Sequence, residues 1–124
     1  MSYVDGFVLA VPTARKQEFV EHVTRSNAVF IEHGALRSYG CWGDDVKAGL
    51  NTDFARAVQA TAEETVVFSW IEWPDKATRD AAMAKMDERM KDPCMDPAQN
   101  PMPFDGRRMI YGGFVPVVAL GRST

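Results

Sequence analysis

The segment from Thr65 to Trp73 constrains the fold most strongly, because it has the composition of a β-strand and carries apolar side chains on both of its alternating faces. One face is small or aliphatic and the other is aromatic and acidic, namely Val67, Ser69 and Ile71 against Phe68, Trp70 and Glu72. The small face suits packing under helices, whereas the aromatic face needs a cover of its own. We therefore expect this strand to lie in a sheet that is covered on both sides.

The first strand is predicted over Tyr3 to Val11, and Pro12-Thr13 ends it with a helix-start signal. Its side chains also divide into a small set and a bulky set, Val4, Gly6, Val8 and Ala10 against Tyr3, Asp5, Phe7 and Leu9. By analogy with the aromatic face of the other strand, we expect the bulky set to lie on the side without helices.

Two amphipathic helices are predicted. The first runs from Ala14 to His33, ends at Gly34 and places apolar residues at helical spacing. These residues are Phe19, Val20, Val23, Phe30 and Ile31, with Asn27 on the same side. The second starts after an N-cap at Asp75 and continues to Lys91. Its apolar face carries Ala82, Met83, Met86 and Met90.

Further strands are predicted over Leu36 to Trp42 and Arg108 to Ala119, with a bulge at Gly112-Gly113. The order β-α-β-β-α-β indicates an α+β, ferredoxin-like fold, a four-stranded antiparallel sheet with both helices on one face. Right-handed crossovers are expected to bring the first and third strands together at the centre, in parallel. Residues 1–124 are expected to form a single domain.

The second face of this sheet is too apolar to be left in water, so we expect it to meet a second subunit in a homodimer. Two connections, 43–64 and 92–106, are longer than the topology needs. Loops of this length are typical of lids, partner contacts or disordered segments, and their role stays open.

Composition excludes several classes of protein. The chain is 46% hydrophobic and 25% charged with a net charge of -3, which argues against extended disorder and against a cationic nucleic-acid surface. Cys41 and Cys94 show no disulfide or zinc spacing, so reduced thiols, no metal and no cofactor are expected. No run of residues is long enough for a membrane span and the start lacks a basic leader, so we expect a cytoplasmic location.

Several blocks of the sequence together resemble a known family. They are YVDGF at 3–7, GALR at 34–37, CWGDD at 41–45, TDF at 52–54 with RAV at 56–58, VVFSWIE at 66–72 and MPFDGRRMIYGGF at 102–114. The chain resembles the YbaA-like bacterial family, catalogued as domain of unknown function 1428, along nearly its whole length. The resemblance implies a ferredoxin-like dimeric α/β-barrel from the bacterial cytoplasm, and it implies no activity and no catalytic residues.

Five residues are candidates for binding a ligand: Trp70, Glu72, Arg79, Arg107 and Tyr111. Trp70 belongs to an apolar set that would either line a chamber or pack a dimer. Arg107 and Arg108 follow an aspartate turn and enter the last predicted strand, an arrangement that suits either an anion clamp or a turn with salt bridges. Arg79 lies on the apolar side of its helix and is expected to point toward the sheet, where Asp5, Asp53, Asp105 or an anionic ligand would pair with it.

The sequence does not indicate a pair of carboxylates that share a proton or a pair of histidines that bind one metal ion. Asp5 and Glu72 are expected to be displaced by about 13 Å along the axes of two parallel strands, too far to share a proton. Arg37 is the expected ion-pair partner of Glu72. His22 and His33 would be about 16 Å apart along one helix, too far to share a metal.

Two classes of function remain. The first is a homodimeric α/β-barrel that binds a small organic molecule, in the manner of a cofactor-independent oxygenase or an isomerase. The alternative is a non-catalytic, stress-associated or protein-interaction module. RNA binding ranks third, because the only adjacent basic pairs are Arg15-Lys16 and Arg107-Arg108. Fold alone does not choose among these functions.

Overall fold

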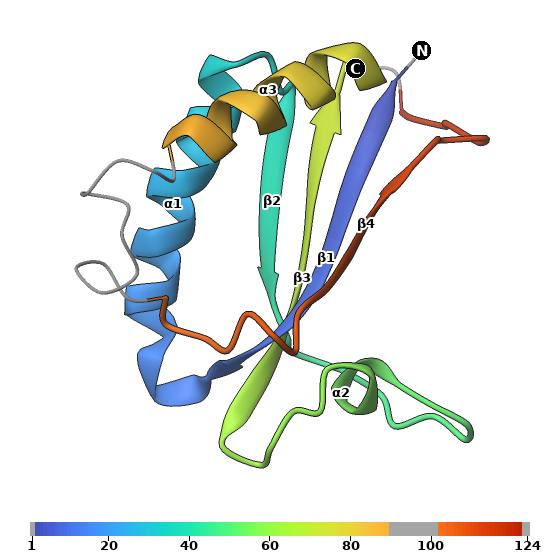
Figure 1. Ribbon diagram of the computed structural model, residues 1–124. Coiled ribbons are helices and arrows are strands. Elements are labelled where there is room, and N and C mark those ends of the chain that lie inside the picture. Colours follow the sequence, from blue (N-terminus) through green and yellow to red (C-terminus); the bar gives the residue numbers. More distant parts are fainter. Residues whose placement is uncertain (1, 90–101, 123–124) are drawn as a thin grey trace.

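The computed structural model describes residues 2–89 and 102–122. The elements along the chain are β1 (Tyr3–Pro12), η1 (Thr13–Arg15), α1 (Lys16–Glu32), β2 (Arg37–Trp42), α2 (Phe54–Ala57), β3 (Glu64–Trp73), α3 (Lys76–Arg89) and β4 (Ile110–Phe114). They form one four-stranded sheet in the order β2-β3-β1-β4, with α1 and α3 on the same side of it (Figure 1). The predicted end of the second helix, with Met90, and the first part of the long connection, with Cys94, lie outside the described residues.

All three pairs of neighbouring strands are antiparallel, including β1 with β3 at the centre of the sheet. The predicted parallel pairing of the first and third strands was therefore wrong. Two strands that are joined by a crossover helix run parallel to each other, and here these two strands are β1 and β2. β3 follows β2 with reversed direction and lies between them, so it is antiparallel to both.

The face assignment of β1 was also wrong. Asp5 lies opposite Ile71 in the register and Leu9 lies opposite Val67, and residues directly opposite each other share a face. The bulky set of β1 therefore lies under the helices, and its small set lies on the other side with Phe68 and Trp70. The register between β1 and β3 determines which side chains share a face of the sheet, whereas the prediction compares only the size of the side chains.

The core between sheet and helices is built by both central strands. Trp73, Ile71, Val11 and Val67 are almost completely buried, and Phe19 and Phe30 of α1 and Ala82 of α3 pack against them. At roughly 1.5–3 kcal/mol for each large apolar side chain removed from water, this layer supplies the main favourable term in folding.

A buried carboxylate ties α3 to the sheet. Asp5 is 3% exposed and accepts hydrogen bonds from Trp73 Nε1 at 2.9 Å and from Arg79 Nη2 at 2.9 Å. The guanidinium of Arg79 also lies over the ring of Tyr3, 5.2 Å from its centroid. The hydrogen bond with Asp5 holds the pKa of Arg79 above its ordinary value. Arg79 therefore points toward the sheet, as predicted, and Asp5 is its acidic partner.

The ends of the two helices meet. Gly34 follows α1 with a φ of 110°, a conformation that favours glycine, and a Cβ at this position would collide with the side chain of Thr78. Asp75 accepts the backbone N–H of Thr78 at 2.7 Å, which confirms the predicted N-cap of α3.

The strand β4 is shorter than predicted and contains no bulge. Its residues pair with β1 in unbroken register from Ile110 opposite Val8 to Phe114 opposite Val4. Gly113 is needed because a Cβ there would overlap the phenol of Tyr3. Pairing ends at Phe114, because β1 has almost no residues left beyond Val4.

On the side of the sheet opposite α1 and α3, the long connection 43–64 folds back over one end of the sheet. Val58, just after α2, is completely buried against Ala10 and Val66. Asp53 caps α2 by accepting the backbone N–H of Arg56 at 2.7 Å. The rest of this side is the open face, defined by Val4, Val8, Tyr39, Phe68, Trp70, Ile110 and Phe114. Its residues Tyr39, Phe68, Ile110 and Phe114 are exposed.

The segment before β4 is held by an ion pair. Arg108 donates to both carboxylate oxygens of Glu64, at 2.8 and 2.6 Å, and to the carbonyl oxygen of Gln59 at 2.8 Å. The hydrogen bonds from Arg108, followed by that from the backbone of Thr61, lower the pKa of Glu64 from 4.5 to about 2. Among the described residues, no helix combines the length and the apolar character needed to cross a bilayer.

Replacing Asp5 with Ala should strongly destabilise the fold, because it leaves the Arg79 guanidinium and the Trp73 indole N–H without their acceptor. We expect the free energy of unfolding, measured by urea titration, to fall by about 3–5 kcal/mol. Asp80→Ala is the matched control, since it removes the exposed partner of the same arginine, and should cost less than about 1 kcal/mol. Equal costs for the two variants would contradict the central role of Asp5.

The Glu64–Arg108 pair should make stability depend on acid pH. Because the pKa of Glu64 is lower in the folded chain than its ordinary 4.5, its contribution is complete above pH 4.5 and is lost as the pH falls toward 2. Urea unfolding between pH 5 and 2 should show a shallower loss of stability for Glu64→Gln than for the wild type. Glu63→Gln, at an exposed neighbouring position, should keep the wild-type slope, and a parallel profile for Glu64→Gln would refute the assignment.

Candidate functional site

A cavity of about 420 Å³ lies between the helices α1 and α3 and the sheet. Its apolar walls come from the sheet, from both helices and from the segment before β4, and consist of Phe7, Leu9, Phe19, Val23, Phe30, Met83, Phe104 and Met109. Polar side chains reach it at a few places, from Asp5, His22, Ser26, Asn27, Ser69, Arg79 and Tyr111. An apolar chamber with a few convergent polar groups is the usual form of a small-molecule site.

One charged pair borders the cavity. Asp5 and Arg79 neutralise each other through hydrogen bonds from Nε and Nη2 of the guanidinium, at 2.9 to 3.2 Å. Arg79 Nη1 in addition donates to Asp80 at 2.9 Å. The pair therefore presents a polar but uncharged surface, which suits a neutral ligand better than an ionised one.

His22 of α1 is the second polar feature of the cavity wall. Its ring lies edge-on to Phe104, with 6.0 Å between the centroids. Burial lowers the pKa of the imidazole below its ordinary value of 6.5, and the charge of Arg25 lowers it further. His22 is therefore a neutral imidazole at neutral pH, able to accept a proton or a hydrogen bond.

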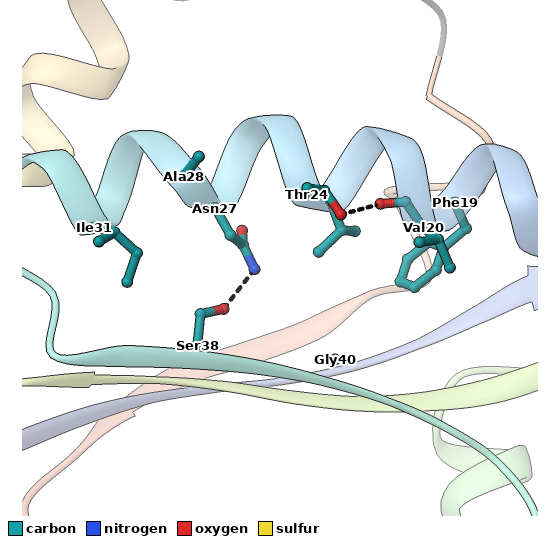
Figure 2. Close-up of a pocket in the computed structure, with 9 residues that line it drawn as sticks. Phe19, Val20, Thr24, Asn27, Ala28, Ile31, Ser38 and Gly40 are labelled. Carbon is teal, nitrogen blue, oxygen red and sulfur yellow. Dashed lines mark hydrogen bonds between the residues drawn. The ribbon is translucent and has the colours of Figure 1, made fainter.

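The polar residues one turn further along α1 are already occupied. Asn27 Nδ2 donates to Ser38 Oγ of β2 at 2.7 Å (Figure 2). Ser26 Oγ donates to the carbonyl oxygen of His22 at 3.0 Å. Figure 2 shows Asn27 pointing from α1 toward Ser38 of β2. A second hollow of about 350 Å³ lies between α1 and β2, and Val20, Thr24 and Ile31 also line it. Asn27 thus fastens the helix to the edge strand.

The five residues predicted to bind a ligand do not form one site. Arg79 and Tyr111 line the cavity, and Tyr111 stacks on Phe7 with 6.3 Å between the ring centroids. Trp70 and Glu72 lie on the opposite side of the sheet. Arg107 is 98% exposed in the segment before β4.

On the open face, Trp70 stacks on Tyr39 with the ring centroids 4.8 Å apart. Glu72 lies beside Arg37, with 3.2 Å between the charged atoms, as predicted. The expected axial separation of Asp5 and Glu72 was wrong, because they lie one position apart in an antiparallel register. They nevertheless point to opposite faces of the sheet, so they do not share a proton.

The two adjacent arginines, Arg107 and Arg108, differ in their exposure to solvent and in their closest acidic partner. Arg108 is held by Glu64, whereas Arg107 extends into solvent with Asp105 as its nearest acidic neighbour, at 3.8 Å. Asp105 accepts the backbone N–H of Arg107 at 3.0 Å and so forms a turn. Within residues 2–89 and 102–122, no group of three or more His, Cys, Asp or Glu side chains is arranged to hold a metal ion.

Sequence reasoning did not select His22, Ser69 or Phe104 for the site. The sequence shows His22 and His33 on one predicted helix, too far apart to share a metal, and gives neither a catalytic partner. The position of His22 on a helix with Val23 and Phe30 indicated a direction toward the sheet, whereas the approach of Phe104 from a distant segment left no local signal in the sequence.

Solved structures with this fold are found at low sequence identity. Two dimeric ferredoxin-like proteins from uncultured marine organisms superimpose with TM-scores of 0.62 and 0.58, at 11% and 10% identity. The first match covers 96% of this chain and 98% of the solved chain, and the second covers 98% of this chain and 100% of the solved chain. The fold of this protein is therefore ferredoxin-like α+β, as predicted.

Sequence comparison gives much closer relatives. An uncharacterized protein YbaA of Escherichia coli K12 is 52% identical over 118 residues, which cover 95% of this chain and 98% of the relative. The YbaA of Shigella flexneri matches to the same extent. The family described as a protein of unknown function, DUF1428, matches residues 2–106. Both findings confirm the resemblance noted from the sequence blocks, and the chain belongs to the DUF1428 family.

Proposed function

We propose that this protein is a homodimer that binds a small, largely apolar and uncharged organic molecule in the cavity between its helices and its sheet. The observation that carries the proposal is the cavity itself, whose aromatic and aliphatic walls surround a neutralised ion pair and a neutral imidazole. Its volume of about 420 Å³ lies within the range of small-molecule sites, about 300–1,000 Å³.

The walls favour a ligand with a flat ring. Phe7, Phe19 and Phe104 present aromatic surfaces from the sheet, from α1 and from the segment before β4, and such surfaces pack well against a second ring. His22 is placed to accept a hydrogen bond from a hydroxyl group on that ring. A phenol-like or enol-like molecule combines these two features.

The same arrangement supports an isomerase or a cofactor-independent oxygenase. Both reactions begin when a base removes a proton from an enolisable or phenolic ligand, and a neutral imidazole in an apolar chamber has the properties of such a base. His22 is the residue we assign to this step. Tyr111 and Ser69 offer hydroxyl groups on the same cavity wall.

The homodimer is supported by the open face of the sheet. Its aromatic side chains Tyr39, Phe68 and Phe114 are exposed, with Ile110 beside them, in a chain whose other sheet face is covered by helices. Contiguous apolar patches of this kind mark interaction surfaces. The solved structures with this fold are described as dimeric. We place the protein in the cytoplasm, where the exposed thiol of Cys41 stays reduced.

Filling the cavity should weaken the binding of a ring-shaped probe. We expect 2-naphthol to bind the wild-type protein, and Val23→Trp to weaken that binding at least tenfold, measured by ligand-observed NMR and fluorescence. Val20→Trp is the matched control, because Val20 lies on the same helix and lines the second hollow between α1 and β2, not the cavity. Met109→Trp, on a different wall of the cavity, should act as Val23→Trp does.

Equal affinity in Val23→Trp and Val20→Trp would reject the cavity as the binding site. Native mass spectrometry of protein purified without added ligand provides the complementary measurement, since a retained molecule appears as excess mass on the subunit. A non-catalytic interaction module is the alternative, and it predicts no naphthol binding and no retained molecule.

A charge on the open face should break the dimer. Phe68→Glu and Trp70→Glu place carboxylates in an apolar interface, and we expect each to raise the dimer dissociation constant at least tenfold, measured by sedimentation equilibrium. Val20→Glu, on the helical side of the sheet, should leave the dissociation constant unchanged. Because Trp70→Glu risks unfolding the chain, circular dichroism should accompany it, and a native dimer of folded Phe68→Glu would refute the assigned face.

A further inference from the structure

The chain ends in an apolar segment that does not pack on its own subunit. Residues 115–122 follow β4 without forming a strand, and Val117 and Leu120 are 92% and 93% exposed. Val115 and Val118 are also exposed, and Arg122 is the only charged residue of the segment. Figure 1 shows this segment, in red, turning beyond the end of β4 and running back toward the N-terminal end of β1. We call residues 115–122 the arm.

The open face contains a matching groove. A hollow of about 450 Å³ lies over β3, β1 and β4, and its walls include Val4, Val8, Phe68, Trp70 and Ile110. Two glycines, Gly6 and Gly112, form part of its floor and leave room for inserted side chains. Phe114, the last residue of β4, also lines the groove, so the arm begins at its border.

The arm and the groove are both apolar, and the described residues of one subunit leave both of them uncovered. None of the described residues that line the groove belongs to the arm of the same subunit. In a two-fold dimer each subunit presents the same surfaces, so the arm of one copy can cover the groove of the other, and the reverse. Eight extended residues span about 26 Å, whereas three adjacent strands span only about 10–15 Å.

The exposed area is also sufficient. Aromatic side chains bury roughly 150–250 Å² each, and Tyr39, Phe68 and Phe114 of the open face are about half exposed. With Ile110 and the four aliphatic side chains of the arm, the exposed apolar surface approaches the ~800 Å² per subunit of a standard interface. The open face alone would provide about half of that area.

We propose that residues 115–122 of each subunit lie in the open-face groove of a second copy, so that the dimer is fastened by two exchanged arms. This inference rests on the proposed homodimer and specifies how it is held together. The arm also covers Trp70, which accounts for an aromatic side chain on a face that the subunit itself does not cover.

Truncation tests the arm. A chain that ends at Phe114 keeps all described helices and strands, and its dimer dissociation constant, measured by sedimentation equilibrium, should rise at least tenfold. A chain that ends at Arg122 is the matched control and should dimerise as the wild type does. In full-length protein, Val117→Asp with Leu120→Asp should reproduce the effect of the truncation.

Photo-crosslinking tests the position of the arm. With p-benzoylphenylalanine at Val117 and a mixture of ¹⁴N- and ¹⁵N-labelled subunits, mass spectrometry should find crosslinks that join the arm of one subunit to 4–8, 68–70 or 110–114 of the other. Crosslinks confined to one subunit, or to other surfaces, would overturn the arm exchange.

The two proposals fail in different ways. A wild-type dimer together with an equally stable truncated dimer overturns the arm and leaves the homodimer standing. A monomeric wild-type protein overturns both.

Discussion

The buried contact among Asp5, Trp73 and Arg79 is the interaction on which the rest of the structure depends. A carboxylate inside an apolar layer is tolerated only when it is paired and hydrogen-bonded, and here one helix and one neighbouring strand supply its partners. This requirement fixes α3 against the sheet. It also determines which side chains of β1 lie on the face of the sheet that α1 and α3 cover, because Asp5 must lie on that face. The position of Asp5 thereby determines which side chains of β1 reach the cavity.

The two sides of the sheet consequently have different surroundings. Beneath the helices, the core contains a cavity with a few polar groups, and its neutral ion pair and neutral imidazole favour an uncharged ligand. On the other side, the loop that contains α2 covers only one end of the strands. The remaining aromatic surface is what a partner would bury. Ligand binding and assembly are thus proposed for opposite sides of the same four strands.

The segment before β4 links these features. It supplies Phe104 and Met109 to the cavity wall, it is held to the start of β3 by the pair of Arg108 with Glu64, and it leads into the edge strand and then the arm. Because the ion pair depends on an ionised Glu64, this attachment of the segment to β3 should weaken only in strong acid.

Local chemistry was readable from the sequence by itself. The strand and helix periods, the cap at Asp75, the stop at Gly34 and the inward direction of Arg79 all follow from short-range spacing. The resulting order of elements indicated the ferredoxin-like fold, and with it the pairing of Arg37 with Glu72 on adjacent strands. The tertiary structure decided the rest. Strand register placed Asp5 and Phe7 under the helices, separated Trp70 from Tyr111 and brought Phe104 to His22. These outcomes depend on pairings between segments distant in the chain, and a strand whose two faces are both apolar carries no local signal that distinguishes one register from the next.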